Sequence, residues 1–382
     1  MKISELQEAS AGPCGRLSLN GAMKKTLCIL LCFLFLWAFP AAAAEETGIC
    51  GDNLSWTVAD GVLTISGHGD MYWYDMGSAP WYPLRQNIRS AVVEEGVTSL
   101  SYCCFFYLTE LREASLPGTL GSLGGMAFYG CRSLPEVTIP AEVYEIGEDV
   151  FYGCRSLTAI RVDSANPSYW EDDGILYAGT SLICYPAARP QERYEILPGT
   201  EKVEPCAFSY SPLEELRIPE SVRSFDATAL TDCYLLRAVE VAWGNWYYTA
   251  RDGVLYSGSM DTLICYPAQK TGSSYRVPAE VKNIAIRAFA GNGNLQRLEV
   301  MGSLQSMGSL AFVSCGALRR VYFHGDVPED MGFSPFPESA RIFYLLGQKG
   351  WDRIAGKTWN VREVQPWTEE TDLLGKSGRL TQ

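Results

Sequence analysis

The sequence predicts a strand-rich solenoid, a repeat protein in which units of about 23 residues stack on one another. Leucine or isoleucine recurs at this spacing, apolar residues alternate directly after it, and aromatic residues return at a fixed later position. The evenly spaced residues are Ile88, Leu111, Leu134 and Leu157, then Leu213 with Leu236, and Leu295 with Leu318. One such unit buries too little apolar surface to fold alone, so neighbouring units should share a core.

Each unit is expected to open with a short β-strand. Counting the opening leucine as position 1, positions 4 and 6 are apolar, as in Val137 and Ile139, and this period of two is typical of a strand with one buried face. Proline at position 7, as in Pro140, should end the strand because it cannot donate to the next ladder bond. Position 18 is aromatic in Phe105, Phe128, Phe151 and Phe312. We expect these rings to fill the space between adjacent units.

Cysteine recurs at position 21, in Cys131, Cys154, Cys233 and Cys315. The first unit has Leu108 at this place, and that exchange favours a buried free thiol. A disulfide elsewhere, for example from Cys103 or Cys104 to a neighbour, is the alternative in a secreted chain. We expect no metal site, because the sequence has no CxxC motif and only two histidines, His68 and His324.

The unit from Leu134 to Cys154 reads LxxVxIPxxVxxIGxxxFxxC. This pattern resembles the BspA-like leucine-rich-repeat family of bacterial surface proteins, and the resemblance extends from about Cys50 to Trp367. It implies a right-handed leucine-rich-repeat solenoid and a part in adhesion to host proteins, cells or other bacteria, without a shared ligand site. The asparagine of the ordinary LxxLxLxxN repeat is missing, so the ligand rules of animal receptor repeats are not carried over.

Two insertions and two caps are expected around the solenoid, which should span residues 88–327. The insertions, about 163–200 and 242–277, contain the matched strings DDGILYAGTSLICYPA and RDGVLYSGSMDTLICYPA, so a unit of about 80 residues is duplicated. Each string predicts a β-hairpin. Residues 45–87 predict an N-terminal β-hairpin cap around Asp60-Gly61, residues 328–367 a C-terminal cap, and 368–382 a flexible tail.

The N-terminus predicts export. Lys24 and Lys25 precede an apolar run from Leu27 to Phe39 and a series of alanines, so residues 23–44 have the order of a signal peptide, cleaved near Ala44. Residues 1–22 are then an extension upstream of the true start. We expect a secreted or surface-associated protein with no membrane insertion after cleavage. The formal net charge of −13 argues against nucleic-acid binding.

The first candidate binding surface is the outward face of the repeat strands, at positions 3 and 5. These residues contribute nothing to the core and form a mixed ribbon with a carboxylate in most units, which would suit a basic or polar partner. They are Glu113, Ser115, Glu136, Thr138, Arg161, Glu215, Arg217, Glu240, Arg297, Glu299, Arg320 and Tyr322.

The second candidate surface is the aromatic cluster ahead of each hairpin. Such rings either stack on a glycan or a host protein, or cover their own hairpin. The residues are Tyr169 and Trp170 in the first insertion and Trp243, Trp246, Tyr247 and Tyr248 in the second.

The function predicted from these features is binding of an extracellular protein or glycan, without catalysis and without a cofactor. An extracellular hydrolase and a structural spacer on the cell surface are the alternatives. The sequence indicates no oligomeric state.

Overall fold

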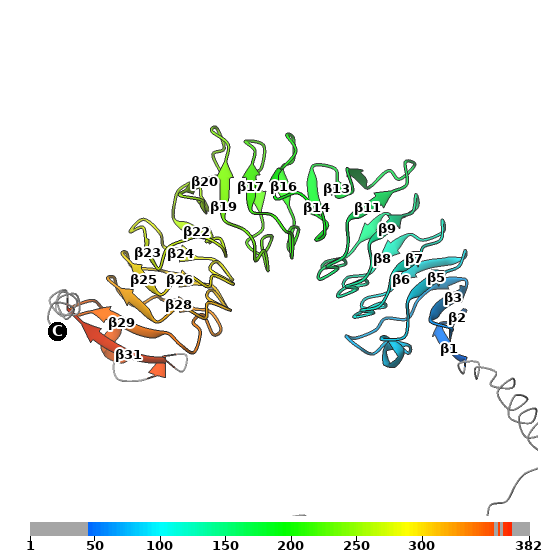
Figure 1. The fold of residues 1–382 in the computed structure, drawn as a ribbon, viewed down its shortest axis with the longest axis horizontal. Helices are drawn as coiled ribbons and strands as arrows, with labels where there is room; N and C mark the ends of the chain where they lie inside the picture. The colour runs from blue at the N-terminus through cyan, green and yellow to red at the C-terminus, as the bar shows by residue number, and fades with distance from the viewer. Residues whose placement is uncertain (1–44, 355–357, 360–361, 369–382) are drawn as a thin grey trace, which may run out of the picture. The chain divides into compact units, whose positions relative to one another are not determined.

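The computed structural model describes residues 45–354, 358–359 and 362–368. The predicted extension (1–22), the predicted signal peptide (23–44) and all but the first residue of the predicted tail lie outside these ranges. Within them, regular structure consists of β-strands and two single-turn 3-10 helices, η1 (Tyr82–Leu84) and η2 (Trp351–Arg353), with no α-helix. The strand-rich solenoid is confirmed, and Figure 1 shows its strands following one another in chain order.

Each repeat unit, called a coil from here on, adds one parallel strand to a first ladder. The strands occupy positions 3 to 6, as predicted, and pair with the same positions of the next coil, so that Leu216 faces Val239. Four sheets of the structure carry this ladder. Its strands are β5 (Ser90–Val93), β7 (Glu113–Ser115), β9 (Glu136–Ile139), β11 (Ala159–Val162), β15 (Arg193–Glu195), β17 (Glu215–Ile218), β19 (Ala238–Val241), β23 (Ser274–Val277), β25 (Arg297–Val300), β27 (Arg320–Phe323), β29 (Arg341–Leu345) and β31 (Arg362–Trp367).

A second parallel ladder forms at positions 12 and 13, where most coils have a strand of only two residues. Leu100 pairs with Leu123 and Ile146 with Leu123 in this ladder, so the apolar residue of position 13 points into the core in successive coils. Its strands are β4 (Gly69–Asp70), β6 (Val97–Leu100), β8 (Ser122–Leu123), β10 (Glu145–Ile146), β14 (Ser181–Cys184), β16 (Lys202–Val203), β18 (Ser224–Phe225), β22 (Thr262–Cys265), β24 (Asn283–Ile284), β26 (Ser306–Met307) and β28 (Asp330–Met331).

The predicted N-terminal hairpin is confirmed and feeds both ladders. Strands β1 (Glu46–Gly51), β2 (Leu54–Ala59) and β3 (Val62–Gly67) are antiparallel. Asp60 and Gly61 have φ of 51° and 83°, as a tight hairpin turn requires. Strand β3 then pairs in parallel with β5, and β4 with β6. Trp81 is fully buried, and its Nε1 donates to the Cys104 carbonyl at 2.7 Å.

Each insertion contains the predicted hairpin and one further strand. The first consists of β12 (Trp170–Asp172), β13 (Ile175–Ala178) and β14, and the second of β20 (Tyr248–Arg251), β21 (Val254–Ser257) and β22. The last strand of each hairpin joins the second ladder, because β14 pairs in parallel with β16 and β22 with β24. Strands β15 and β23 lie inside the segments 163–200 and 242–277 and pair in the first ladder, so coils resume there.

The position-18 rings stack through the interior, as predicted. Phe128 lies 5.2 Å from Phe105 and 5.9 Å from Phe151 between ring centroids. After the second insertion, Tyr266 of the LICYPA string lies 4.8 Å from Phe289, whose ring is 4.5 Å from Phe312. The buried apolar side chains group into three clusters, which span Cys50–Leu176, Ile175–Ile264 and Val254–Val364.

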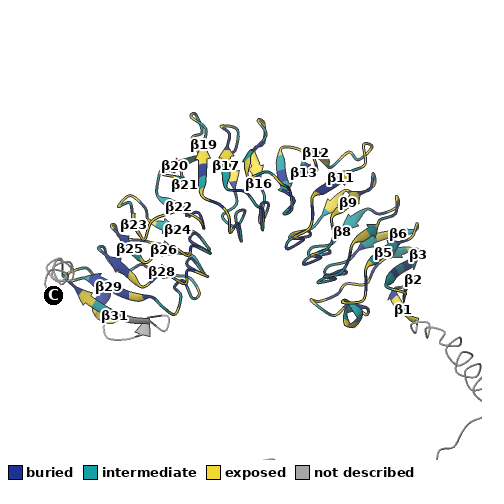
Figure 2. Ribbon diagram, viewed as in Figure 1, coloured by how far each residue is buried: buried dark blue, intermediate teal, exposed yellow. Residues whose placement is uncertain are grey.

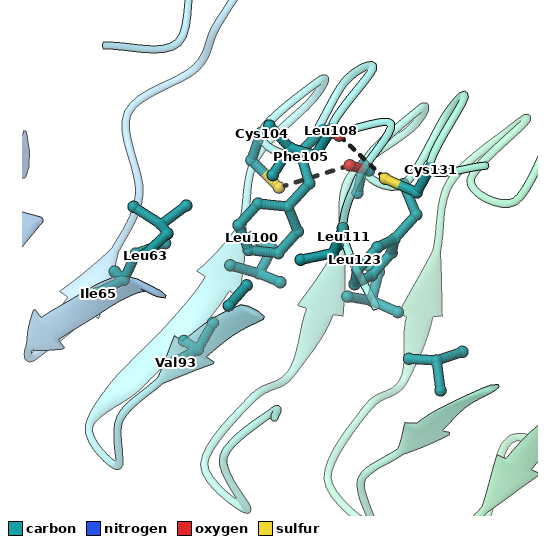
Figure 3. Packing of buried hydrophobic residues seen from close by; sticks show 14 of the residues in the cluster. Leu63, Ile65, Val93, Leu100, Cys104, Phe105, Leu108, Leu111, Leu123 and Cys131 are labelled. Atoms are coloured by element: carbon teal, nitrogen blue, oxygen red, sulfur yellow. Dashed lines mark hydrogen bonds between the residues drawn. The ribbon is translucent and has the colours of Figure 1, made fainter. Parts of the chain in front are cut away.

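All ten described cysteines are free thiols, and those at position 21 are buried. Each of these donates to the carbonyl of the position-18 aromatic residue in the preceding coil. Figure 3 shows the bond from Cys131 Sγ to the Phe105 carbonyl, which is 3.2 Å long. Free buried thiols, rather than a disulfide at Cys103 or Cys104, are therefore what the structure contains.

The C-terminal cap closes the last coils with aromatic side chains. Trp351 is fully buried, its Nε1 donates to the Gly325 carbonyl at 3.0 Å, and its ring stacks on Tyr344 at 5.1 Å. Strand β30 (Thr358–Trp359) pairs antiparallel with β31. Strand β31 in turn extends the first ladder past β29.

Candidate functional site

The strand-face ribbon, meaning the residues at positions 3 and 5 of the first ladder, is exposed along much of its length. Figure 2 shows exposed residues on β9, β17 and β19. Of the residues predicted for it, Glu113, Glu136, Thr138, Arg161, Arg217, Glu240 and Arg320 are exposed, and Glu215 and Arg297 are partly buried.

Most carboxylates of the ribbon already face an arginine of the protein. Arg161 Nε lies 3.3 Å from Glu136 Oε2, and its Nη1 lies 3.3 Å from Glu171 in the first insertion. Farther along, Arg193 pairs with Glu215 at 3.2 Å. Such surface pairs add little stability, but they leave the ribbon less acidic toward a partner than its sequence indicates.

Two ribbon residues are buried, contrary to the prediction. Glu299 is 9 % exposed and accepts hydrogen bonds from Arg276 at 2.9 Å and Arg297 at 2.8 Å. Tyr322 is 7 % exposed and packs between Phe343, at 4.9 Å, and Trp367, at 5.2 Å. Both point to the expected face. Phe343 of β29 and Trp367 of β31 cover that face at Tyr322, whereas the side chains of Arg276 and Arg297 cover it at Glu299.

Two of the predicted aromatic residues pack inside the insertions. Tyr169 and Tyr248 occupy matched places, and each hydroxyl accepts the backbone N–H of a second-ladder strand. The donors are Ile146 N at 2.8 Å and Phe225 N at 2.7 Å. The hydroxyl groups of these two partly buried tyrosines therefore hold the insertions onto the solenoid.

An asparagine in each insertion anchors the same turn, and sequence reasoning missed it. Asn245 Nδ2 donates to the Pro219 and Val222 carbonyls at 2.8 and 3.0 Å, and its Oδ1 accepts from Tyr247 N and Tyr248 N at 2.9 Å each. Asn166 makes the equivalent four bonds in the first insertion. The signal was present, because both asparagines stand three residues before the matched tyrosine.

The remaining tryptophans differ sharply between the insertions. Trp170 stacks on Tyr177 at 4.4 Å, and its Nε1 donates to the Gly179 carbonyl at 3.0 Å, so its own hairpin holds it. Trp243 and Trp246 are 98 % and 89 % exposed, with Tyr247 beside them at 50 %. The first insertion has Ser164 and Pro167 at the places of these two tryptophans. The turn therefore does not require an aromatic residue at either position.

A shallow groove of about 590 Å³ lies beside this turn, which we call the Trp243–Trp246 loop. The two indoles form part of its wall, and Glu220, Asn245 and Thr249 supply polar groups. Gly244 permits the close approach of the turn to Glu220: it has φ of 101°, and a Cβ there would lie 3.1 Å from Glu220 Oε2. The groove thus combines flat apolar faces with hydrogen-bonding groups.

Neither histidine stands in an arrangement typical of catalysis. His68 is exposed in the N-terminal cap, and His324 Nε2 lies 3.9 Å from Glu299 Oε2 with its ring against Trp367. In the part of the chain that the structure describes, no three His, Cys, Asp or Glu side chains gather as metal ligands would. The same residues include no helix with the length and apolarity needed to cross a bilayer.

Comparison with known families supports the repeat assignment. The family described as "BspA type Leucine rich repeat region" matches in six copies, over residues 82–171, 191–247 and 268–335, which together are more than half of the chain. The chain belongs to the BspA-type leucine-rich-repeat family. The two gaps between the BspA-type matches fall where β13 with β14 and β21 with β22 form the inserted hairpins.

Solved bacterial leucine-rich-repeat proteins are similar in fold. A leucine-rich repeat protein from Eubacterium ventriosum is 21 % identical, with 86 % of this chain and 73 % of that chain covered and a TM-score of 0.44. The pneumococcal vaccine antigen PcpA is 16 % identical, with coverages of 87 % and 89 % and a TM-score of 0.41. A leucine rich cell surface protein from Faecalibacterium prausnitzii is 18 % identical, with coverages of 74 % and 96 % and a TM-score of 0.36. A search of curated proteins finds no match. With TM-scores this low, these structures carry no functional argument.

Proposed function

We propose that this BspA-type protein is exported and binds a protein or glycan outside the cell, without catalysis, through the Trp243–Trp246 loop. The exposure of the two tryptophans carries the proposal. Their indole rings are almost fully exposed to water, which is unfavourable for an apolar surface, and they contribute no packing to the core. Exposed apolar side chains that gather at one place mark interaction sites, and tryptophan is enriched among residues that dominate binding energy. Export is supported by the signal-like segment 23–44.

The duplicated insertion gives an internal comparison for this proposal. The first insertion keeps the asparagine anchor and the packed tyrosine but has Ser164 and Pro167 where the second has tryptophans. Since the same frame forms without them, Trp243 and Trp246 serve something other than folding of the insertion. The groove beside them adds the carboxylate of Glu220 and the hydroxyl of Thr249, groups that bond to sugar hydroxyls or to backbone amides.

The strand-face ribbon is the second candidate surface. Glu113, Glu136 and Thr138 are exposed on neighbouring coils, so a partner could lie along the strands there. The internal pairing of Glu136 with Arg161 and the burial of Glu299 and Tyr322 count against an acidic ribbon as the main contact surface.

Binding of two variants to an array of glycans and extracellular matrix proteins distinguishes the Trp243–Trp246 loop from the strand-face ribbon. The first carries Trp243→Ser and Trp246→Ala, and we expect it to lose at least about tenfold in affinity, as for truncated hot-spot residues. The second carries Glu113→Gln and Glu136→Gln and should bind as the unmodified protein does. Both need an unchanged melting temperature. Binding that survives the first variant and fails in the second would assign the ligand to the ribbon.

The alternatives have their own readouts. A hydrolase would turn over substrates in glycosidase, peptidase and esterase screens, and we expect no turnover. A spacer would bind nothing on the array and nothing on whole cells. Turnover, or a complete lack of binding by the unmodified protein, would therefore contradict the proposal.

A further inference from the structure

A cavity of about 290 Å³ lies where the first insertion meets the solenoid, away from the Trp243–Trp246 loop. It forms between coil 134–156, the end of β14 and coil 191–212, and we call it the junction cavity. Ile146, Phe151, Leu157 and Ile183 supply apolar wall. Its volume is at the lower end of those of ligand pockets, and a largely apolar wall with a few polar groups is typical of such sites.

The charged groups in the lining of the junction cavity are all carboxylates, and its other polar side chains carry hydroxyl or thiol groups, including the hydroxyls of Tyr152 and Tyr185. Glu148, Asp149, Glu204, Cys206 and Ser209 line it, and its lining includes no lysine, arginine or histidine. Asp149 Oδ1 and Ser209 Oγ are buried and make no hydrogen bond of normal geometry among the described residues, and the group that lies beside both is the Cys206 thiol. Ser209 is only 8 % exposed. A buried polar group without a hydrogen bond lowers the stability of the folded protein. A ligand that donates hydrogen bonds to these two groups would remove that cost.

The neighbouring groups of the protein do not neutralise this site. Burial, and next the Asp149 carboxylate, raise the pKa of Cys206 to about 12, so the thiol stays protonated and uncharged at neutral pH. A thiol is a weak donor. Lys202 pairs with Glu204 Oε1 at 2.8 Å but is not part of the lining, so no lysine or arginine of the lining faces Glu148 or Asp149.

The second insertion shows that the fold does not need these polar residues. Tyr169 and Tyr248 fix the alignment of the two junctions, and so do the matched bonds from Tyr185 N to the Ala207 carbonyl and from Tyr266 N to the Ala288 carbonyl. The residues of the second junction that match the five polar ones are, in the same order, Ala227, Thr228, Ala285, Arg287 and Ala290. The second junction also supplies its own cation, because Arg287 Nη1 lies 3.9 Å from Asp232.

We propose that the junction cavity binds a small organic cation, a primary ammonium group on an apolar stem of a few carbon atoms. The ammonium group donates to Asp149 Oδ1 and Ser209 Oγ and compensates the carboxylates, and the stem lies against Phe151 and Ile183. Charge-assisted bonds in a partly buried site are the strong kind. Either a free amine or a lysine side chain of a partner carries this chemistry.

Calorimetric titration of the full chain with hexylammonium tests the cavity, with hexanol as the neutral isostere and hexanoate as the anion. Hexylammonium should bind about ten- to one-hundredfold more tightly than hexanol, as expected when a hydrogen bond to a charged group is lost. Hexanoate should not bind. A tripeptide with a central lysine and blocked ends separates the two sources: binding by it assigns a lysine side chain, and binding by hexylammonium alone a free amine.

Asp149→Asn is the deciding variant, because φ at this residue is 55° and asparagine tolerates that conformation. It should weaken hexylammonium binding by about tenfold or more and leave hexanol binding unchanged, which also shows that the cavity is still formed. Ser209→Ala should weaken hexylammonium less. Glu145→Gln, which removes an exposed carboxylate of β10 outside the lining, is the matched control and should have no effect.

Equal affinities for hexylammonium and hexanol would overturn the proposal, as would an unchanged hexylammonium affinity in Asp149→Asn or a lack of saturable binding. The site is independent of the proposed function. The Trp243→Ser, Trp246→Ala variant should bind hexylammonium as the unmodified protein does, so failure of one proposal leaves the other standing.

Discussion

At the scale of single residues, the side chain at position 21 donates a hydrogen bond to a backbone carbonyl of the preceding coil in most coils. The thiols of Cys131, Cys154, Cys233 and Cys315 donate to a carbonyl of the preceding coil at 3.2, 3.1, 3.1 and 2.9 Å. In coil 272–294 the same position is Asn292, fully buried, whose Nδ2 donates to the Pro267 carbonyl at 3.0 Å. The position thus accepts a small side chain with a donor, or an apolar one such as Leu108.

These buried thiols predict a loss of stability at high pH. Burial raises the pKa of Cys233 and Cys315 from the ordinary range of a thiol, near 9, to about 12. The contribution of these thiols to the free energy of unfolding is therefore complete below about pH 9 and is lost as the pH rises toward 12. In that pH range only the unfolded chain releases the thiol proton. Each thiol should cost about 1.4 kcal/mol per pH unit there.

Urea unfolding at about pH 8 and about pH 10 measures this loss. A variant with Cys233→Ala and Cys315→Ala should lose less stability between the two pH values than the unmodified protein. The buried tyrosines titrate at high pH in both proteins and cancel in the comparison. Equal losses would show that these thiols do not carry the dependence.

At the scale of elements, each insertion depends on one asparagine and one tyrosine rather than on its hairpin alone. The Asn245 side chain makes four hydrogen bonds to backbone groups, and the Tyr248 hydroxyl adds a fifth to Phe225 N. An amide offers two donors on nitrogen and two acceptor sites on oxygen, so all its capacity is used. The anchor also fixes the backbone that presents Trp246.

Asn245→Ala should therefore destabilise the protein by about 1 to 3 kcal/mol, because it leaves backbone groups unpaired. We expect ligand affinity through the Trp243–Trp246 loop to fall with it, since the turn is no longer held. Chemical denaturation and the binding array measure the two effects. Asn166→Ala is the matched control: it should cost similar stability and leave ligand affinity unchanged. Equal losses of affinity in both variants would contradict a local role for Asn245.

The sequence predicts those strands and turns that have a recognisable local pattern of residues. The strands of coils 111–133 and 134–156 follow from period two after a leucine, and the hairpin turns from Asp-Gly. Strands β15 and β23 were absent from the predicted repeats because Gln191 and Gly272 stand where leucine is expected. Strands β12 and β20 have no alternation and form only because a hairpin strand pairs with them.

For the candidate sites too, the sequence predicts what depends on local geometry and does not predict what depends on contacts between distant residues. Exposure of positions 3 and 5 follows from strand geometry in the first coils. The predicted exposure is wrong for Tyr322, because Trp367, which is distant in the sequence, packs against its ring. Nor does the sequence distinguish Trp170, which stacks on its hairpin, from Trp243, which does not, since that depends on tertiary contacts. The same holds for left-handed residues such as Cys103 and Tyr107, where no glycine marks the turn.

At the scale of the whole described chain, the core is a row of three apolar clusters that meet at the insertions. The first ends at Leu176, the second begins at Ile175, and the third begins at Val254 where the second ends at Ile264. In a solenoid each coil contacts mainly its neighbours, so stability is close to a sum of local terms. The clusters should then behave as partly separate cooperative units.

Phe289→Ala tests this separation. The ring is fully buried between Tyr266 and Phe312, so its removal should cost about 3 to 5 kcal/mol. Hydrogen exchange should show the loss of protection mainly in residues 254–345, with residues 50–160 spared. Phe128→Ala is the counterpart and should give the reverse pattern. Uniform loss across the chain in both variants would mean a single cooperative unit.

The duplicated insertion has a consequence for how such a chain changes length over generations. The repeated stretch of about 80 residues begins and ends at equivalent places of the two ladders, since β14 leads into β16 as β22 leads into β24. Unequal recombination between the two copies in the gene would add or delete a whole stretch without leaving an unpaired strand edge. The surface turn of each copy can then diverge on its own, as Ser164 and Trp243 have done.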